Sequence, residues 1–359
     1  MSERIRSIVS TIQPVDRAAG QAASTHINNL TKPVGSLGEL EKIAIQLAEI
    51  TGNPLSDVFP PGVIVFAADH GIAEEGVSAY PQEVTAQMVH NFLQEGAAIN
   101  VFTRSVNGFI EIVDVGVKSD IDADGLIVEK VAYGTKNFAK GPAMTREEAV
   151  RAIEAGMKRA EVMIEKGAKL LIVGEMGIAN TTPSSAIVAS ITGANIRSLV
   201  GQGTGLQASA LDYKAVVIEG ALKLLQPDSE DPLDLLEKVG GFEIGAMAGA
   251  MLYAASRRVP ILLDGFICTA SALVAAKFSE HVKDYMIAGH HSVEPGHTAA
   301  LLALGKKPLL TLELRLGEGS GAVLAYPLVE AATKMVKEMA TFDGAQISRE
   351  TITNQTMEC

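Results

Sequence analysis

The sequence contains no tryptophan and only two cysteines, and aromatic side chains make up 4% of its 359 residues. Cys268 lies in an apolar stretch and Cys359 ends the chain, so neither a disulfide framework nor a zinc cluster is expected. Such sparse use of cysteine is typical of a reducing compartment. We therefore predict a cytoplasmic protein.

Long apolar runs are also missing. No predominantly apolar stretch reaches the roughly 20 uncharged residues that a membrane helix requires, and the start of the chain lacks the apolar core of a signal peptide. These absences predict a soluble protein without a membrane partner.

Positive charge is in deficit, with 30 Lys and Arg against 42 Asp and Glu and a net charge of −12. Basic residues form no cluster and few aromatic rings are available for base stacking, which argues against a nucleic-acid partner. A small anionic ligand remains compatible with this charge, because it needs only one local group of hydrogen-bond donors.

The dominant pattern is a short apolar, β-branched stretch that runs into a Gly-rich or acidic turn and then into a helical pattern. This alternation predicts an α/β fold with a parallel sheet flanked by helices. The stretches are apolar almost throughout, as strands covered on both faces are. The candidate strands are Gly62–Ala68, Phe109–Val115, Lys169–Val173, Val259–Leu263 and Asp284–Ala288.

Several helices have recognisable ends. Thr145 and Glu148 form a capping box that opens a helix through Glu165, and Asn180 is placed to cap a helix over Ser184–Thr192. Gly241–Arg257 has small residues at four-residue spacing and predicts a buried helix in close contact with a neighbour. Residues 1–60 and 321–359 are helical in pattern, so we expect them to form one small helical domain beside an α/β catalytic domain of residues 61–320.

Ligands of open parallel sheets bind beyond the carboxyl ends of the strands, which directs attention to the turns that follow the apolar stretches. In the last such turn, Gly317 and Gly319 flank Glu318 and leave its carboxylate free of neighbouring bulk. Glu175 stands between glycines in the same way. Taken singly, either residue is also compatible with a solvated glutamate in an ordinary turn. Five turns stand out: Asp69–Gly71, Gly174–Gly177, Asp264–Gly265, Gly289–Ser292 and Gly317–Gly321.

A glycine-rich loop, Gly201–Gly205, is able to present backbone amides to a phosphate, and Lys214 follows it. The loop lacks the signature of a P-loop or of a dinucleotide fingerprint, and Lys214 alone is equally compatible with a surface lysine.

Histidines 290, 291 and 297 suggest a metal site only weakly, since adjacent histidines point in different directions. Asp69 and His70 are either a catalytic pair or a turn in which Asp69 caps backbone amides. No Gly-x-Ser-x-Gly elbow is present, so covalent serine or cysteine catalysis has little support.

Six segments in one order resemble the CobT family of nicotinate-nucleotide–dimethylbenzimidazole phosphoribosyltransferases, which act in the assembly of the cobalamin nucleotide loop. They span nearly the whole chain, and their common order makes the resemblance specific. The segments are Thr31–Glu41, Ala67–Gly71 with Val77–Pro81, Gly174–Thr182, Gly201–Gly205, Leu263–Phe266 and Arg315–Gly321.

The resemblance implies a Rossmann-like large domain, a small domain built from both termini, a homodimer, and no metal or organic cofactor. It implies that Glu318 is the catalytic base and that Glu175 lines the same cleft. It also assigns two groups of binding residues: Ser78, Tyr80, Gln87 and Leu316 around the planar base, and Gly177, Asn180, Thr181, Gly203, Lys214, Gly265 and Ser292 around the ribose phosphate.

The implied chemistry starts from nicotinate mononucleotide, whose pyridinium ring leaves without protonation. The incoming benzimidazole loses a proton as its other nitrogen attacks, and Glu318 is suited to accept that proton. Glu175 is suited to stabilise the cation-like ribosyl transition state. Two alternatives are a dinucleotide oxidoreductase, which would need a GxGxxG after the first strand, and a noncatalytic nucleotide-binding protein.

Overall fold

The computed structural model describes residues 1–203, 205 and 208–348, apart from the side chains of residues 208 and 209. Thr204 of the glycine-rich loop and the terminal Cys359 lie outside the described residues. Contacts divide the chain into a larger unit, Met1–Val15 with Val58–Pro327, and a smaller unit, Asp16–Asp57 with the chain from Leu328 onward.

These boundaries differ from the expected 1–60, 61–320 and 321–359. The first residues belong to the larger unit because helix α1 (Glu3–Thr11) packs on α6 (Arg146–Glu165) and α11 (Phe242–Ser256), with Ile5 fully buried. Tyr285 Oη also donates a hydrogen bond to the carbonyl of Gln13 at 2.8 Å. At the other end, the first residues of α14 still belong to the larger unit.

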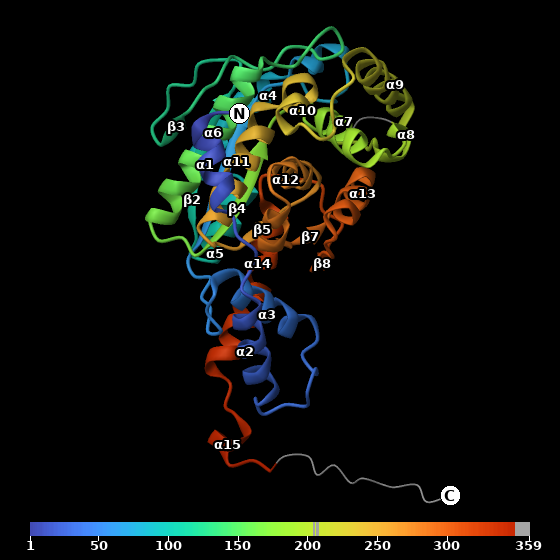
Figure 1. The fold of residues 1–359 in the computed structure, drawn as a ribbon. Helices are drawn as coiled ribbons and strands as arrows, with labels where there is room; N and C mark the ends of the chain where they lie inside the picture. Colours follow the sequence, from blue (N-terminus) through green and yellow to red (C-terminus); the bar gives the residue numbers. More distant parts are fainter. Residues whose placement is uncertain (204, 206–207, 349–359) are drawn as a thin grey trace, which may run out of the picture. The chain divides into compact units, whose positions relative to one another are not determined.

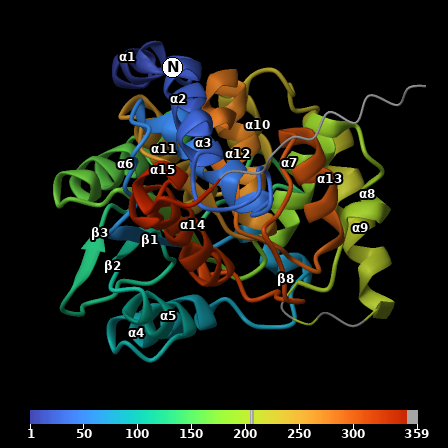
Figure 2. The same ribbon diagram turned by 90° about the horizontal axis from the view of Figure 1, so that it is seen from below.

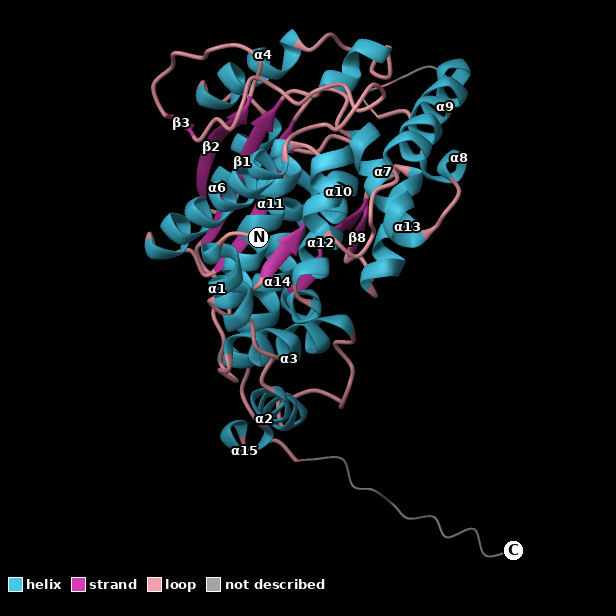
Figure 3. Ribbon diagram, turned by 45° about the horizontal axis from the view of Figure 1, so that its top comes forward, coloured by secondary structure: helices cyan, strands magenta, loops and turns pink. Residues whose placement is uncertain are grey.

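The larger unit is built on a six-stranded sheet in the order β3-β2-β1-β4-β5-β6, and every strand pair is parallel (Figure 3). The predicted α/β fold with a parallel, Rossmann-like sheet is therefore confirmed. Strand order reverses between β1 and β4, and such a switch point is where open α/β sheets bind ligands. The strands are β1 Pro61–Ala68, β2 Phe109–Gly116, β3 Leu126–Val128, β4 Leu170–Met176, β5 Ile261–Leu263 and β6 Met286–Ala288.

Some local predictions were wrong. Asp284 and Tyr285 were predicted in a strand but end a 3-10 helix, Glu280–Tyr285, in which the Tyr285 side chain reaches back to Gln13. Strand β3 escaped prediction because it is short and only partly buried. A separate pair of two-residue strands, β7 (His290–His291) and β8 (Leu310–Thr311), was also missed.

Helices cover both faces of the sheet (Figures 1 and 2). On one face, α4, α5 and the first turns of α14 contact the strands or the turns that follow them, and on the other face lie α6, α11 and α12. The helices of this unit beyond α1 are the 3-10 turn Gly71–Glu75, α4 Glu83–Leu93, α5 Ala98–Ser105, α6 Arg146–Glu165, α7 Thr181–Thr192, α8 Ile196–Leu199, α9 Ala208–Leu225, α10 Pro232–Val239, α11 Phe242–Ser256, α12 Phe266–Phe278, α13 Pro295–Leu304 and the start of α14 Ser320–Glu338.

The two predicted helix starts differ in outcome. Thr145 and Glu148 form the expected capping box, with each side chain accepting the other's backbone N–H, at 3.2 and 2.7 Å. Asn180 occupies the N-cap position of α7, but its side chain makes no cap hydrogen bond and donates to Glu175 instead. A hydrogen bond to the end of the preceding strand, five residues earlier, thus replaces capping of the helix.

The smaller unit is helical. It contains α2 Arg17–Asn28, α3 Glu39–Thr51, the later part of α14 and α15 Phe342–Ala345. The His26 ring and the Val336 carbonyl lie 2.9 Å apart, and Leu30 bridges to Thr341, so its N-terminal and C-terminal segments are held together.

The predicted buried helix of small residues is confirmed as α11, which packs on α6 through glycines. A Cβ on Gly156 would overlap the carbonyl of Ala246, and a Cβ on Gly249 would overlap the carbonyl of Ile153. The two backbones approach so closely because neither position carries a side chain.

We expect Gly156→Ala to lower the free energy of unfolding by about 1–3 kcal/mol, because the added methyl group has to push α11 away. The matched control is Gly220→Ala in α9, where the new Cβ meets nothing within 4 Å. That change should raise stability by about 0.5–1 kcal/mol. Urea unfolding of both variants measures the difference, and equal effects would contradict this account of the α6–α11 contact.

Candidate active site

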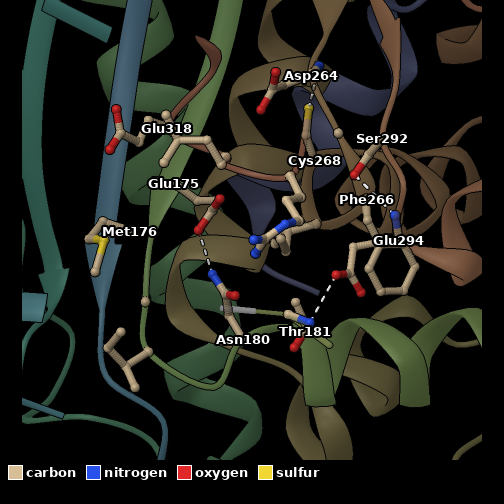
Figure 4. A pocket seen from close by; sticks show the side chains of 18 of the residues that line it. Glu175, Met176, Asn180, Thr181, Asp264, Phe266, Cys268, Ser292, Glu294 and Glu318 are labelled. Carbon is tan, nitrogen blue, oxygen red and sulfur yellow. Dashed lines mark hydrogen bonds between the residues drawn. The ribbon is translucent and has the colours of Figure 1, made fainter. Parts of the chain in front are cut away.

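A cavity of about 360 Å³ opens in the larger unit, where the chain leaves β4 and β5 (Figure 4). We call it the main pocket. It brings together most of the predicted residues, although they come from distant parts of the chain. The predicted residues that line it are Tyr80, Glu175, Gly177, Asn180, Thr181, Gly203, Gly265, Ser292, Leu316 and Glu318.

Three predicted residues are not among those that line the pocket. Lys214 lies directly behind the wall and is described below. Ser78 is half-buried, and its hydroxyl accepts the backbone N–H of Tyr80 at 3.4 Å. Gln87 is exposed on α4, while Val84 and Met88 of that helix line the pocket.

Glu318 is buried within an unusual backbone turn. It has a φ of +65° and lies between Gly317 at +87° and Gly319 at +94°. The turn passes so close to β4 that a Cβ on Gly174 would overlap the carbonyl of Glu318. The carboxylate accepts the backbone N–H of Ile99, at the start of α5, at 3.2 Å.

The environment changes the acidity of Glu318. Burial raises the pKa of its carboxyl group to about 7; the Ile99 N–H acts in the opposite direction and the negative charge of Asp264 adds to the rise. Glu318 therefore changes charge near neutral pH, which is where a general base is most effective.

Glu175 ends β4 and is also buried. Burial, followed by the charge of Glu243, raises the pKa of its carboxyl group to about 8, while the hydrogen bond from Asn180 lowers it. A Cβ on Gly317 would overlap Glu175 Oε1, so the carboxyl group of Glu175 packs directly against the Glu318 turn.

Asp264 holds that turn in place. It follows β5, and its two carboxylate oxygens accept the backbone N–H groups of Gly319 at 3.2 Å, Gly321 at 2.8 Å and Ala322 at 3.1 Å. His290 Nε2 lies 3.2 Å from the same carboxylate. The sequence drew attention to the Asp264–Gly265 turn but assigned Asp264 no role, because the bonds that define it join distant segments.

A second side of the pocket is rich in hydrogen-bond donors. Figure 4 shows Glu318 and Met176 on one side and Thr181 and Glu294 on the other. On this second side, Lys214 Nζ donates to the Thr181 hydroxyl at 2.7 Å, and the Gly203 N–H donates to Glu294 at 2.9 Å. Burial lowers the pKa of Lys214 to about 8, and Glu294 partly opposes that shift.

Two helices begin at this pocket. Helices α7 and α12 start beside it; the Asn180 side chain makes no cap hydrogen bond to α7, and Gly265 at the start of α12 has no side chain with which to cap. In the first turn of α7, the Thr182 N–H donates to the Ala179 carbonyl and Pro183 has no N–H. The positive end of the helix dipole makes such helix starts suitable for binding phosphate.

The three histidines lie beside different groups of the protein: His290 beside Asp264, His291 beside Thr298 and His297 beside Thr269. Thr269 donates its hydroxyl proton to the Gly265 carbonyl, so His297 Nε2, 3.0 Å away, is the donor to Thr269. His297 Nδ1 then accepts the Ser292 N–H at 2.9 Å, and burial lowers the pKa of His297 to about 3. No group of three or more His, Cys, Asp or Glu residues suited to a metal ion occurs within the described residues.

His70 does not pair with Asp69. The Asp69 carboxylate accepts the Lys118 N–H at 2.8 Å, a bond from a residue 49 positions away and not from an amide of its own turn. His70 Nε2 instead lies 2.6 Å from Glu243 Oε1 of α11. Covalent cysteine catalysis gains no support either, because burial raises the pKa of the Cys268 thiol.

Several lining residues carried no assignment from the sequence: Met88, Met176, Phe266, Glu294 and Arg315. Met88 belongs to an apolar pattern that is indistinguishable from core positions, whereas Met176 and Phe266 lay within segments already singled out, Gly174–Gly177 and Leu263–Phe266. Glu294 and Arg315 lie close to two turns that the sequence had already singled out, Gly289–Ser292 and Gly317–Gly321. This closeness in sequence was the one indication that they could line the pocket.

Comparisons with known proteins agree with this arrangement. Residues 12–347 match a family model described as phosphoribosyltransferase. A nicotinate-nucleotide–dimethylbenzimidazole phosphoribosyltransferase from Halalkalibacterium halodurans is 49% identical over 96% of this chain and 97% of its own, and one from Chloroflexus aggregans is 52% identical over 95% and 97%. The crystal structure of CobT from Thermus thermophilus superposes with a TM-score of 0.90, at 46% identity, over 93% of this chain and 100% of its own.

The described residues contain no helix that is long and apolar enough to cross a membrane.

Proposed function

Because the chain belongs to the family of nicotinate-nucleotide–dimethylbenzimidazole phosphoribosyltransferases, we propose that it transfers ribose 5-phosphate from nicotinate mononucleotide to 5,6-dimethylbenzimidazole or a related base. The products are α-ribazole 5′-phosphate and nicotinate, and the reaction serves the assembly of the lower ligand of cobalamin.

The observation that carries the proposal is the buried carboxyl group of Glu318 beside this pocket. The pyridinium of the nucleotide leaves with the bonding electrons of the broken C–N bond and becomes neutral. One nitrogen of the benzimidazole forms the new bond to the anomeric carbon, and its other nitrogen must lose a proton. A carboxylate that ionises near neutrality accepts that proton without help from a cofactor.

Of the two carboxyl groups, we assign the base to Glu318. Glu175 accepts the Asn180 side-chain amide through Oε2 and packs against Gly317 through Oε1, whereas Glu318 accepts the backbone N–H of Ile99 through Oε2. Burial raises the pKa of both carboxyl groups, to about 8 for Glu175 and about 7 for Glu318. Glu175 lines the same pocket, and we propose that it stabilises the cation-like ribosyl transition state electrostatically.

The planar base fits the side of the pocket near Glu318. Tyr80 and Leu316 are large side chains that are 52% and 57% exposed, and Val84 and Met88 line the same pocket. Covering these apolar surfaces with a flat ring removes them from water, which favours binding. Ser78 and Gln87 remain candidates at the edge of this region.

The ribose phosphate fits the opposite side. There the starts of α7 and α12, Gly177, Gly265 and Ser292 surround a space backed by Thr181 and Lys214. Backbone N–H groups supply directed donors, and the Lys214 ammonium supplies a compensating charge.

The proposal is tested by incubating the protein with nicotinate mononucleotide and 5,6-dimethylbenzimidazole and separating the products by chromatography. Nicotinate and α-ribazole 5′-phosphate should appear in equal amounts. Binding of the nucleotide without release of nicotinate would indicate a noncatalytic binding protein.

We further propose that the enzyme works as a homodimer in the cytoplasm, as the family resemblance implies. Sedimentation velocity at micromolar concentration should give twice the mass of the 37.7 kDa chain. A monomer that is fully active would refute the dimer as the working form.

A further inference from the structure

Glu294 lines the main pocket but has no part in the mechanism so far. It precedes α13 and lies on the side of the pocket proposed for the ribose phosphate (Figure 4). The residue is 6% exposed, and its Oε2 atom has no hydrogen-bond partner among the described residues. Burying a carboxyl group in this way costs free energy, and a carboxylate at this place also repels an incoming phosphate. Its position therefore calls for a role other than direct contact with the phosphate.

The carboxyl group of Glu294 contacts the glycine-rich loop instead. Its Oε1 atom accepts the backbone N–H of Gly203 at 2.9 Å. A Cβ on Gly201 would overlap Glu294 Oε2 and the Pro295 ring, so the backbone of Gly201 packs directly on the carboxyl group. Both carboxyl oxygens thus adjoin the loop, and the Gly203 N–H is already used by the protein.

Gly203 in turn adjoins two residues assigned to the phosphate. A Cβ on Gly203 would lie 3.0 Å from the Thr181 hydroxyl oxygen and 3.8 Å from Lys214 Nζ. Lys214 Nζ donates to the same hydroxyl group at 2.7 Å. A continuous series of contacts therefore runs from Glu294 through Gly203 to Thr181 and Lys214.

The backbone of Glu294 is held independently of its side chain. Its N–H donates to the Ser292 hydroxyl at 3.3 Å, and its carbonyl accepts the His297 N–H at 2.9 Å. Although Glu294 occupies the N-cap position of α13, its side chain makes no cap hydrogen bond. The start of α13 therefore does not depend on the carboxyl group, whose hydrogen bond goes to the loop.

We propose that Glu294 is a positioning residue for the ribose phosphate. Acting through Gly203, its carboxyl group fixes the glycine-rich loop beside Thr181 and Lys214 and so holds these two donors in place for the phosphate. This inference rests on the function proposed above and assigns Glu294 a part in it.

The physical reason is preorganisation. Glycine loses more conformational freedom on ordering than any other residue, so a loop that is already fixed spares the nucleotide that entropic cost on binding. Charge-assisted contacts with phosphate also depend on the geometry of their donors. Loss of the hydrogen bond from Gly203 should therefore weaken nucleotide binding more than it slows the chemical step.

The first test is Glu294→Ala, which removes both contacts with the loop. The dissociation constant of nicotinate mononucleotide, measured by titration calorimetry without the benzimidazole, should rise roughly tenfold. The KM for the benzimidazole and kcat at saturating nucleotide should change far less. Equal dissociation constants for wild type and variant, or a similar loss for both substrates, would overturn the proposal.

Glu294→Gln separates the hydrogen bond from the charge. Glutamine keeps an oxygen that can accept the Gly203 N–H, so the dissociation constant of the nucleotide should stay within about threefold of the wild-type value. If Glu294→Gln weakens binding as much as Glu294→Ala does, the hydrogen bond to the loop is not the cause and the proposal is wrong.

Gly201→Ala perturbs the same contact from the side of the loop. Its methyl group would overlap Glu294 Oε2 and push the loop away, so nucleotide binding should weaken as in Glu294→Ala. The matched control is Gly141→Ala, at a loop glycine where a Cβ meets nothing within 4 Å, and its dissociation constant should equal that of the wild type. If Glu294→Ala does not fold, Gly201→Ala still decides, and unchanged nucleotide binding in it contradicts the proposal.

Nicotinate riboside, which lacks the phosphate, shows which part of the nucleotide is concerned. As a competitive inhibitor of nicotinate mononucleotide, it should have the same inhibition constant with wild type and Glu294→Ala. A rise equal to that for the nucleotide would contradict a role toward the phosphate. Failure of the wild-type protein to form product would instead refute the proposed function, because the calorimetric measurements need no turnover.

Discussion

Glu318→Gln is expected to slow the chemical step by roughly a hundred- to ten-thousand-fold, the usual loss when a positioned general base is removed. Glutamine keeps the size of the side chain and an oxygen that can accept the Ile99 N–H, so folding and both substrate affinities should largely survive. Single-turnover kinetics at pH 8 separate the chemical step from binding.

The pH dependence of kcat/KM tests the same assignment of Glu318 as the base. A base acts only when ionised, and burial raises the pKa of Glu318 to about 7, so the wild-type kcat/KM should fall as pH drops through neutrality. Without the structure, an ordinary glutamate would place this limb well below neutrality. In Glu318→Gln, kcat/KM should no longer fall as pH drops through neutrality.

Glu313→Gln is the matched control for this experiment. Glu313 precedes the same turn and also has a positive φ, +55°, but it is exposed and does not line the main pocket. The Glu313→Gln enzyme should carry out the chemical step at the wild-type rate. A Glu318→Gln enzyme with near wild-type turnover and an intact acid limb would exclude Glu318 as the base and direct attention to Glu175.

Lys214→Ala is expected to raise the KM for nicotinate mononucleotide by roughly 10- to 150-fold, which corresponds to the loss of about 1.5–3 kcal/mol from one charge-assisted contact. The KM for the benzimidazole should change little, because Lys214 lies behind Thr181 on the side of the pocket away from Glu318.

The charge of Lys214 also predicts a pH effect. Burial lowers its pKa to about 8, so in the free enzyme the ammonium is present below that pH and is lost above it. Nucleotide binding should weaken as pH rises through 8, and the variant should lack this dependence. The control is Lys223→Ala, an exposed lysine of the same helix α9. Equal nucleotide KM values for wild type and Lys214→Ala would remove Lys214 from the site.

Much of the architecture was readable from local patterns. Continuous apolar stretches followed by glycine or acidic turns specified parallel strands, because strands buried on both faces tolerate few polar residues. The small residues of Gly241–Arg257 indicated a closely packed helix for a similar reason: backbones approach only where side chains are absent. The ends of parallel strands share one edge of the sheet, so Glu175, Gly265 and Glu318 were correctly expected near one another.

The tertiary structure alone decided the hydrogen-bond partners and the acidity of those residues. Asn180 looks like a helix cap in sequence, yet it donates to Glu175. His70 follows Asp69 in the chain, yet it pairs with Glu243 from another layer of the fold. Acidity depends on burial and on charges that arrive from distant segments, and neither is encoded in a residue's neighbours along the chain. The sequence by itself therefore determined which groups reach the pocket, whereas the burial and the hydrogen bonds that set the acidity of these groups were decided by three-dimensional packing.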